Sequence, residues 1–227
     1  MPRQCTGKLS DLHPPHAFTD QQIFPSPLVK KPMNFANMEQ LNWQIGDVTT
    51  SAKGIRSAPL TDGKNGSLTF QLTVPEHALH APFRASAYND PGATRKTICF
   101  RVHEELEASL SNVDAYMSDY IAKHANRLFK NKQMTYKPLL QLKEDYPALF
   151  RAKINIGGSK ACKFWTPQYS RCDPPQNLRD CGLVPVVCFR SLWIMGSECG
   201  ITVDVTDLMC DTSTEECPFL QGTHSLL

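Results

Sequence analysis

The sequence has no stretch that approaches the roughly 18 consecutive apolar residues of a membrane-spanning helix. Its first residues, Met1 to Cys5, lack the apolar run of a secretory signal peptide. Both absences favour a soluble protein of the intracellular, reducing compartment, a location that includes the nucleus or a site of viral replication.

Motifs of the common enzyme classes are also missing. The chain contains no Gly-x-x-x-x-Gly-Lys-Ser/Thr phosphate loop, no Gly-x-Ser-x-Gly elbow and no His-Glu-x-x-His zinc motif. Asp204 and Asp207, three residues apart near a strand end, are the one carboxylate pair suited to Mg²⁺. Because no further acids accompany them at strand ends, a metal-dependent nuclease is a minor alternative, and we expect no catalytic residues.

Cysteine is plentiful, but its pattern does not indicate a metal site. The nine cysteines include no Cys-x-x-Cys pair, which the usual zinc ribbons require. In a reducing compartment a disulfide framework is not expected either. We therefore predict buried or surface thiols, with no structural metal and no cofactor.

Charge is unevenly distributed, although the net charge is only +2. Residues 121–170 hold ten lysines and arginines against two acids, whereas residues 171–227 hold three arginines against eight acids. The basic middle of the chain is a candidate surface for a polyanion.

Proline content and hydrophobic periodicity divide the chain into three parts. Residues 1–34 are rich in proline and have little periodicity, which predicts a flexible arm. Residues 35–210 form the predicted folded domain, and residues 211–227 form a mildly acidic tail.

Within the predicted domain, most segments alternate apolar and polar residues, which is typical of strands. Such alternation occurs at 41–45, 68–74, 98–102, 149–156 and 201–205, and 184–195 is a mostly apolar run. Residues 104–129 instead have the period of a helix. Together they predict a mainly β fold, an OB-type five-stranded barrel with one long inserted α-helix.

Aromatic residues are interleaved with the cations of the basic middle. Cations follow phosphates, and exposed rings stack on the bases of single strands. Lys163, Phe164 and Trp165 come where a strand gives way to a loop, so we expect Trp165 to stack on bases. Trp193 lies in an apolar run and is expected in the core.

The order of several short elements resembles that of a known family, the single-stranded-DNA-binding proteins of podophages and nucleocytoplasmic large DNA viruses. The resemblance covers roughly residues 40–210, and no single element of it is specific. It is carried by Asp114 on the long helix and by 80–88 (HAPFRASAY), 95–102 (RKTICFRV), 128–130 (LFK), 136–139 (YKPL), 145–147 (DYP), 150–154 (FRAKI), 192–194 (LWI) and 199–203 (CGITV).

The resemblance implies an OB fold with an inserted helix that binds single-stranded DNA without catalysis, in DNA replication, recombination or repair. It also implies that the protein acts together with a DNA polymerase or helicase. The sequence departs from the family at Phe83-Arg84, where the family has Phe-Gly, and in its tail, which is less acidic than that of the phage relatives.

The basic, aromatic middle and the resemblance together give one set of expected nucleic-acid-binding residues. An OB-type scaffold that binds RNA or protein through the same basic face is the runner-up. The expected binding residues are Arg84, Tyr88, Arg95, Lys96, Arg101, Lys130, Lys132, Tyr136, Lys137, Arg151, Lys153, Lys163, Phe164 and Trp165.

Overall fold

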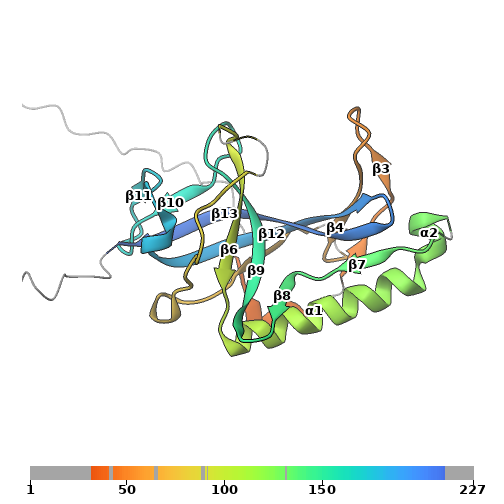
Figure 1. Ribbon diagram of the computed structural model, residues 1–227, viewed down its shortest axis with the longest axis horizontal. Helices are drawn as coiled ribbons and strands as arrows, with labels where there is room; N and C mark the ends of the chain where they lie inside the picture. Colours follow the sequence, from red (N-terminus) through yellow and green to blue (C-terminus); the bar gives the residue numbers. More distant parts are fainter. Residues whose placement is uncertain are drawn as a thin grey trace, which may run out of the picture. The chain divides into compact units, whose positions relative to one another are not determined.

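A computed structural model describes residues 32–40, 43–63, 66–87, 90, 92–130 and 132–212 (Figure 1). The expectations for Tyr88, for the arm up to residue 31 and for the tail from residue 213 lie outside the described residues. Within the described part of the chain, no helix combines the length and apolarity needed to cross a membrane.

Two long antiparallel strands, β12 (Gly182–Met195) and β13 (Glu198–Asp211), form the centre of the sheet. Gly196 turns the chain between them with a φ of +61°, a conformation that glycine adopts without steric cost. The outer edge of β12 pairs with β5 (Leu68–Gln71) and then β4 (Arg56–Thr61). The outer edge of β13 pairs in turn with β7 (Thr135–Lys137), β9 (Tyr146–Asn155) and β10 (Lys163–Trp165).

The remaining strands extend these branches. β6 (Arg95–Arg101) and β8 (Leu140–Lys143) both pair with β9. β2 (Gln44–Ile45) and β3 (Thr49–Thr50) pair with β4. β1 (Met33–Asn34) pairs with β5, and β11 (Arg171–Cys172) with β10. Short 3-10 helices occupy Phe35–Gln40, Pro75–His77 and Leu178–Asp180.

The mainly β fold with one long helix is confirmed, but the five-stranded barrel is not. The named strands within the described residues pair as one open, branched sheet. Isolated bridges at Leu79–Leu183 and His80–Arg101 connect β12 to β6 through a segment that belongs to no named strand. β4 was not expected from the sequence, because Pro59 interrupts a short segment that has no clear alternation.

The long helix, α1 (Glu104–Lys123), ends earlier than the expected boundary at residue 129. His124 interrupts it, and the short α2 (Ala125–Phe129) follows. The His124 ring is exposed and lies 4.3 Å from that of Tyr120. At the first turn, the backbone N–H of Leu106 donates to Nδ1 of the capping His103.

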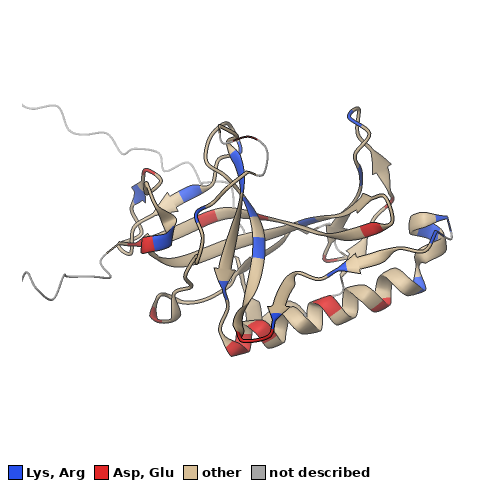
Figure 2. Cartoon of the chain, in the orientation of Figure 1, with Lys and Arg blue, Asp and Glu red and all other residues tan. Residues whose placement is uncertain are grey.

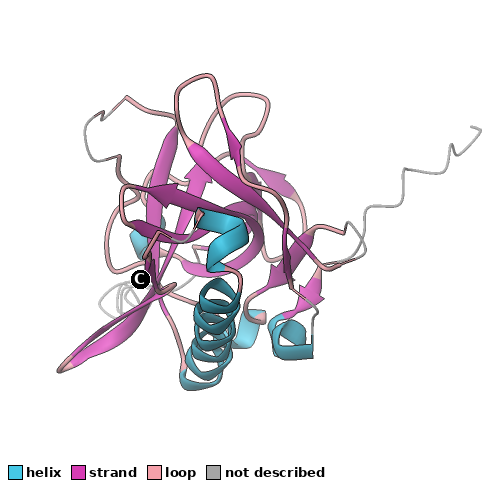
Figure 3. Cartoon of the chain, turned by 90° about the vertical axis from the view of Figure 1, so that its right-hand side faces the viewer, coloured by secondary structure: helices cyan, strands magenta, loops and turns pink. Residues whose placement is uncertain are grey.

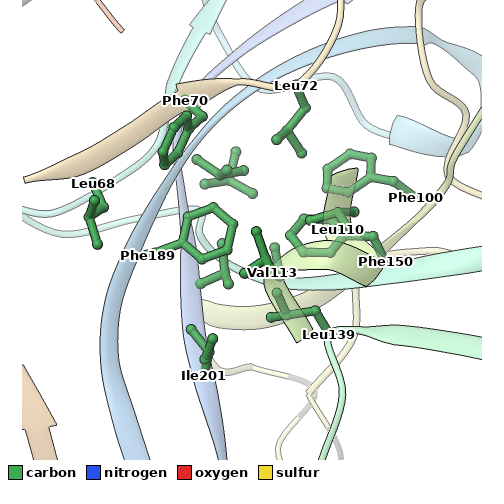
Figure 4. Close-up of a cluster of buried hydrophobic side chains, with 14 of the residues drawn as sticks. Leu68, Phe70, Leu72, Phe100, Leu110, Val113, Leu139, Phe150, Phe189 and Ile201 are labelled. Atoms are coloured by element: carbon green, nitrogen blue, oxygen red, sulfur yellow. The ribbon is translucent and has the colours of Figure 1, made fainter. Parts of the chain in front are cut away.

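The core lies between α1 and the sheet, with α1 on one side of the strands (Figure 3). Phe100 from β6 and Phe150 from β9 stack with ring centroids 6.4 Å apart, close to Leu110 of α1 (Figure 4). Phe189 of β12 packs edge-on against Phe70 of β5, with ring centroids 5.6 Å apart. Burial of these large rings provides much of the hydrophobic stabilisation.

One carboxylate ties α1 to the segment that leads into β8. Asp114 accepts a hydrogen bond from the Tyr136 hydroxyl at 2.8 Å. It also accepts the backbone N–H groups of Leu139 at 2.9 Å and Leu140 at 3.3 Å. Burial raises the pKa of Asp114, and these hydrogen bonds offset part of that rise. The helix therefore fixes residues 136–140, including Lys137.

We predict that Asp114→Ala lowers the free energy of unfolding by about 2–4 kcal/mol, because three donors lose their charged acceptor. Urea denaturation measures this change. Asp119→Ala, an exposed position on the same helix, is the matched control and should change stability by about 0.5 kcal/mol or less. Equal effects of the two substitutions would show that the Asp114 contacts do not hold the segment.

Candidate nucleic-acid interface

Residues of the β12–β13 hairpin and of the strands around it line a groove of about 1030 Å³. We call it the basic groove. Its floor consists of residues 193–196 and 201–203 of the β12–β13 hairpin. One wall is formed by residues 53–56, which run from the β3–β4 loop into the first residue of β4. The other wall is formed by β6, β9 (151–153) and the 137–139 segment.

Positive charge dominates this groove. Among its described lining residues Glu198 is the one acid, and its carboxylate pairs with the Lys137 ammonium at 2.8 Å. Figure 2 shows the cations in blue on the β3–β4 loop and along β6 and β9. The lining cations are Lys53, Arg56, Arg95, Lys137, Arg151 and Lys153.

An ion pair with Asp204 positions Arg95. Its Nη2 lies 2.6 Å from Oδ1 of Asp204, whose side chain is only 15% exposed. Arg190 approaches the other oxygen of Asp204 at 3.3 Å. The two arginines together exceed the charge of the single carboxylate, so this corner of the groove keeps a net positive charge.

Lys153 lies among other cations. Along β9, Ala152 and Ile154 are buried while Arg151 and Lys153 are exposed, as the alternation predicted. The Lys153 ammonium donates to Oγ1 of Thr97 at 2.8 Å. Partial burial and the charges of Arg95 and Arg151 lower the pKa of Lys153, and Asp204 opposes them. Such crowding of like charges is relieved when an anion binds.

Trp193 lies on the floor of the groove, so its expected place in the core was wrong. Leu192 and Ile194 are buried, and Trp193 points to the opposite face of β12 and is half-buried. Its indole lies against Gly200 of β13, where an added Cβ would come within 2.7 Å of Cζ2. The missing side chain at Gly200 is therefore what makes room for the ring.

The structure brings four of the expected binding residues into the basic groove: Arg95, Lys137, Arg151 and Lys153. The others that it describes lie outside the groove lining. Lys96 is half-buried on β6, and the exposed ones are Arg84, Arg101, Lys130, Lys132 and Lys163.

Two expected stacking residues have structural roles instead. Phe164 is 3% exposed and belongs to the core, so its ring is not accessible to a base. Tyr136 is half-buried and donates its hydroxyl to Asp114. Burial and the neighbouring Asp114 carboxylate raise the Tyr136 pKa. Both expectations came from a local coincidence of rings and cations, which does not show which face of a strand is buried.

Trp165 is half-buried in β10, outside the groove. Its Nε1–H donates to Asp207 at 3.1 Å, and the Arg171 guanidinium lies 5.0 Å from the centre of its ring. Asp204 and Asp207 are thus engaged by arginine and indole N–H groups. Over the described ranges, no group of three His, Cys, Asp or Glu side chains is arranged to hold a metal ion.

Sequence reasoning missed Trp193, Lys53 and Arg56 as groove residues. For Trp193 a signal existed, because Leu192 and Ile194 share one face of the strand and Trp193 lies on the other. Lys53 and Arg56 carried no such signal, since their position follows from the long-range pairing of β4 with β12.

No protein-family model matches the sequence, and no curated protein matches it. Among solved structures, similarity is found to a single-stranded DNA-binding protein from bacteriophage Enc34 in complex with ssDNA, at 9% identity and a TM-score of 0.44 over 74% of this chain and 96% of that one. Bacteriophage T7 gp2.5, also a single-stranded DNA binding protein, matches at 11% identity and a TM-score of 0.39 over 64% of this chain and 87% of that one. At such values the functional assignment depends on the residues of this chain.

We predict that Gly200→Ala lowers the free energy of unfolding by about 1–3 kcal/mol, because the new methyl group collides with the Trp193 ring. The same substitution made together with Trp193→Ala should cost much less, since the ring is then absent. A double-mutant cycle followed by urea denaturation measures the coupling. Additive effects of the two substitutions would contradict the contact.

Proposed function

We propose that this chain is a non-catalytic single-stranded-DNA-binding protein that holds the strand in the basic groove. The observation that carries the proposal is the half-buried Trp193 ring on the floor of a groove lined by six cations. A role in DNA replication, recombination or repair, beside a polymerase or helicase, is proposed from the sequence resemblance.

The chemistry of the groove suits an unpaired strand. Lysine and arginine side chains neutralise phosphates of any nucleic acid and release counterions. An aromatic ring stacks on a base whose face is free, as in a single strand. In a duplex, the neighbouring base pairs cover each base face. Stacking on Trp193 therefore increases the affinity for single strands and not for duplexes.

The cations of the basic groove predict that binding depends on salt. Affinity for the oligonucleotide dT20 should fall with salt by about 0.7 log units per log unit of salt for each phosphate neutralised. Arg151→Ala and Lys153→Ala should each weaken binding and reduce this slope, because each removes one phosphate contact. Lys123→Ala, at the exposed end of α1, is the matched control and should leave the slope unchanged.

Fluorescence anisotropy with labelled dT20, duplex DNA and RNA of equal length tests this prediction at several salt concentrations. A dT20 affinity that does not change with salt concentration would contradict electrostatic binding. Equal affinity for RNA, or for the duplex, would redirect the proposal to a general polyanion surface.

The Trp193 ring predicts that binding also depends on base stacking. Trp193→Ala should weaken binding of dT20 by about 1–3 kcal/mol, because the base loses its ring partner. Trp193→Phe keeps an aromatic face and should recover much of the affinity. Thermal melting of each variant verifies that the fold persists. Unchanged dT20 affinity in folded Trp193→Ala protein would refute Trp193 as the stacking residue.

A further inference from the structure

The hairpin formed by β10 and β11 carries a second group of aromatic and basic side chains. We call it the aromatic hairpin and define it by Lys163, Trp165, Tyr169 and Arg171. Lys163 and Arg171 are exposed, and Tyr169 is 75% exposed, more than any other large hydrophobic side chain in the described part of the chain. An aromatic ring so far in solvent does not contribute to the core of this chain.

Tyr169 is held in a conformation that seldom suits its side chain. Its φ is +60°, in the left-handed region that glycine favours. The turn is closed by hydrogen bonds from Tyr169 N–H to the Thr166 carbonyl and from Thr166 N–H to the Ser170 carbonyl, both 2.9 Å. Hairpins usually place glycine at such a position. A bulky ring kept there at a steric cost, and exposed, indicates a use outside the fold.

The other ring of the hairpin is fixed in orientation. Asp207 accepts the indole N–H of Trp165, and the Arg171 guanidinium covers the ring at 5.0 Å. A guanidinium plane is itself a surface on which bases stack, and its charge attracts phosphate. The hairpin thus presents two stacking surfaces, Arg171 and Tyr169.

β13 connects this hairpin to the basic groove. Gly200 lies beneath Trp193 in the groove, and Met209 pairs with Trp165 in the hairpin. Between them, Asp204 binds Arg95 of the groove wall and also Arg190. At about 3.3 Å per residue, the path along β13 from Gly200 to Met209 is about 30 Å long.

We propose that the aromatic hairpin is a second subsite for the same single strand. The strand leaves Trp193, passes Arg95 and Arg190, and stacks its later bases on Arg171 and Tyr169. This inference rests on the proposed function, because it extends the bound strand beyond the groove. It implies a site longer than the groove alone could hold.

Oligonucleotide length tests the proposal. Four stacked nucleotides at about 3.4 Å each span roughly 14 Å and do not reach from the groove to the hairpin, whereas twenty do. Affinities of dT4 and dT20 are measured for the wild-type chain, Tyr169→Gly, Arg171→Ala and Trp193→Ala. Tyr169→Gly suits the positive φ and should keep the fold intact, as thermal melting verifies. Tyr146→Ala, which removes a 72% exposed ring from β9, is the matched control.

We expect Tyr169→Gly and Arg171→Ala to weaken dT20 binding roughly tenfold each and to leave dT4 binding unchanged. Trp193→Ala should weaken both, and Tyr146→Ala neither. If Tyr169→Gly and Arg171→Ala bind dT20 as tightly as the wild type, the second subsite is refuted while the groove stands. If the wild-type chain binds neither oligonucleotide, the proposed function fails and the second subsite fails with it.

Discussion

The pairing of β12 with β13 is the constraint on which the rest of the structure depends. A strand has only two edges to which others can bond, and these two use one edge on each other. Because each is 14 residues long, its outer edge holds several short strands one after another. Residues of the hairpin and of those strands line the basic groove. Every wall of the groove is therefore positioned by one hairpin.

The groove combines features that a protein interior avoids. Partial burial, together with the charges of Arg95 and Arg151, lowers the pKa of Lys153. Part of the large Trp193 ring is exposed to solvent. The ring fits against β13 only because residue 200 is glycine and has no side chain. All of them favour an anionic ligand with flat, apolar faces.

Local patterns in the sequence predicted the elements better than their arrangement. Alternation around Phe150 and Ile154 located β9 and gave Arg151 and Lys153 their exposed face, and the helical period located α1. Trp193 and Phe164 were assigned to the wrong environments, because rings near cations or within an apolar run do not reveal which face packs on the core. The open, branched sheet depends on pairings between distant segments, such as β4 with β12. No local pattern encodes such pairings.

Photo-crosslinking tests the central claim, a single strand bound in the basic groove, most directly. A dT20 oligonucleotide with 5-iododeoxyuridine at successive positions is bound, irradiated and digested, and the attached peptide is identified by mass spectrometry. The account predicts attachment to Trp193. Efficient attachment only to residues outside the groove and the aromatic hairpin, with Trp193 unmodified, would contradict it.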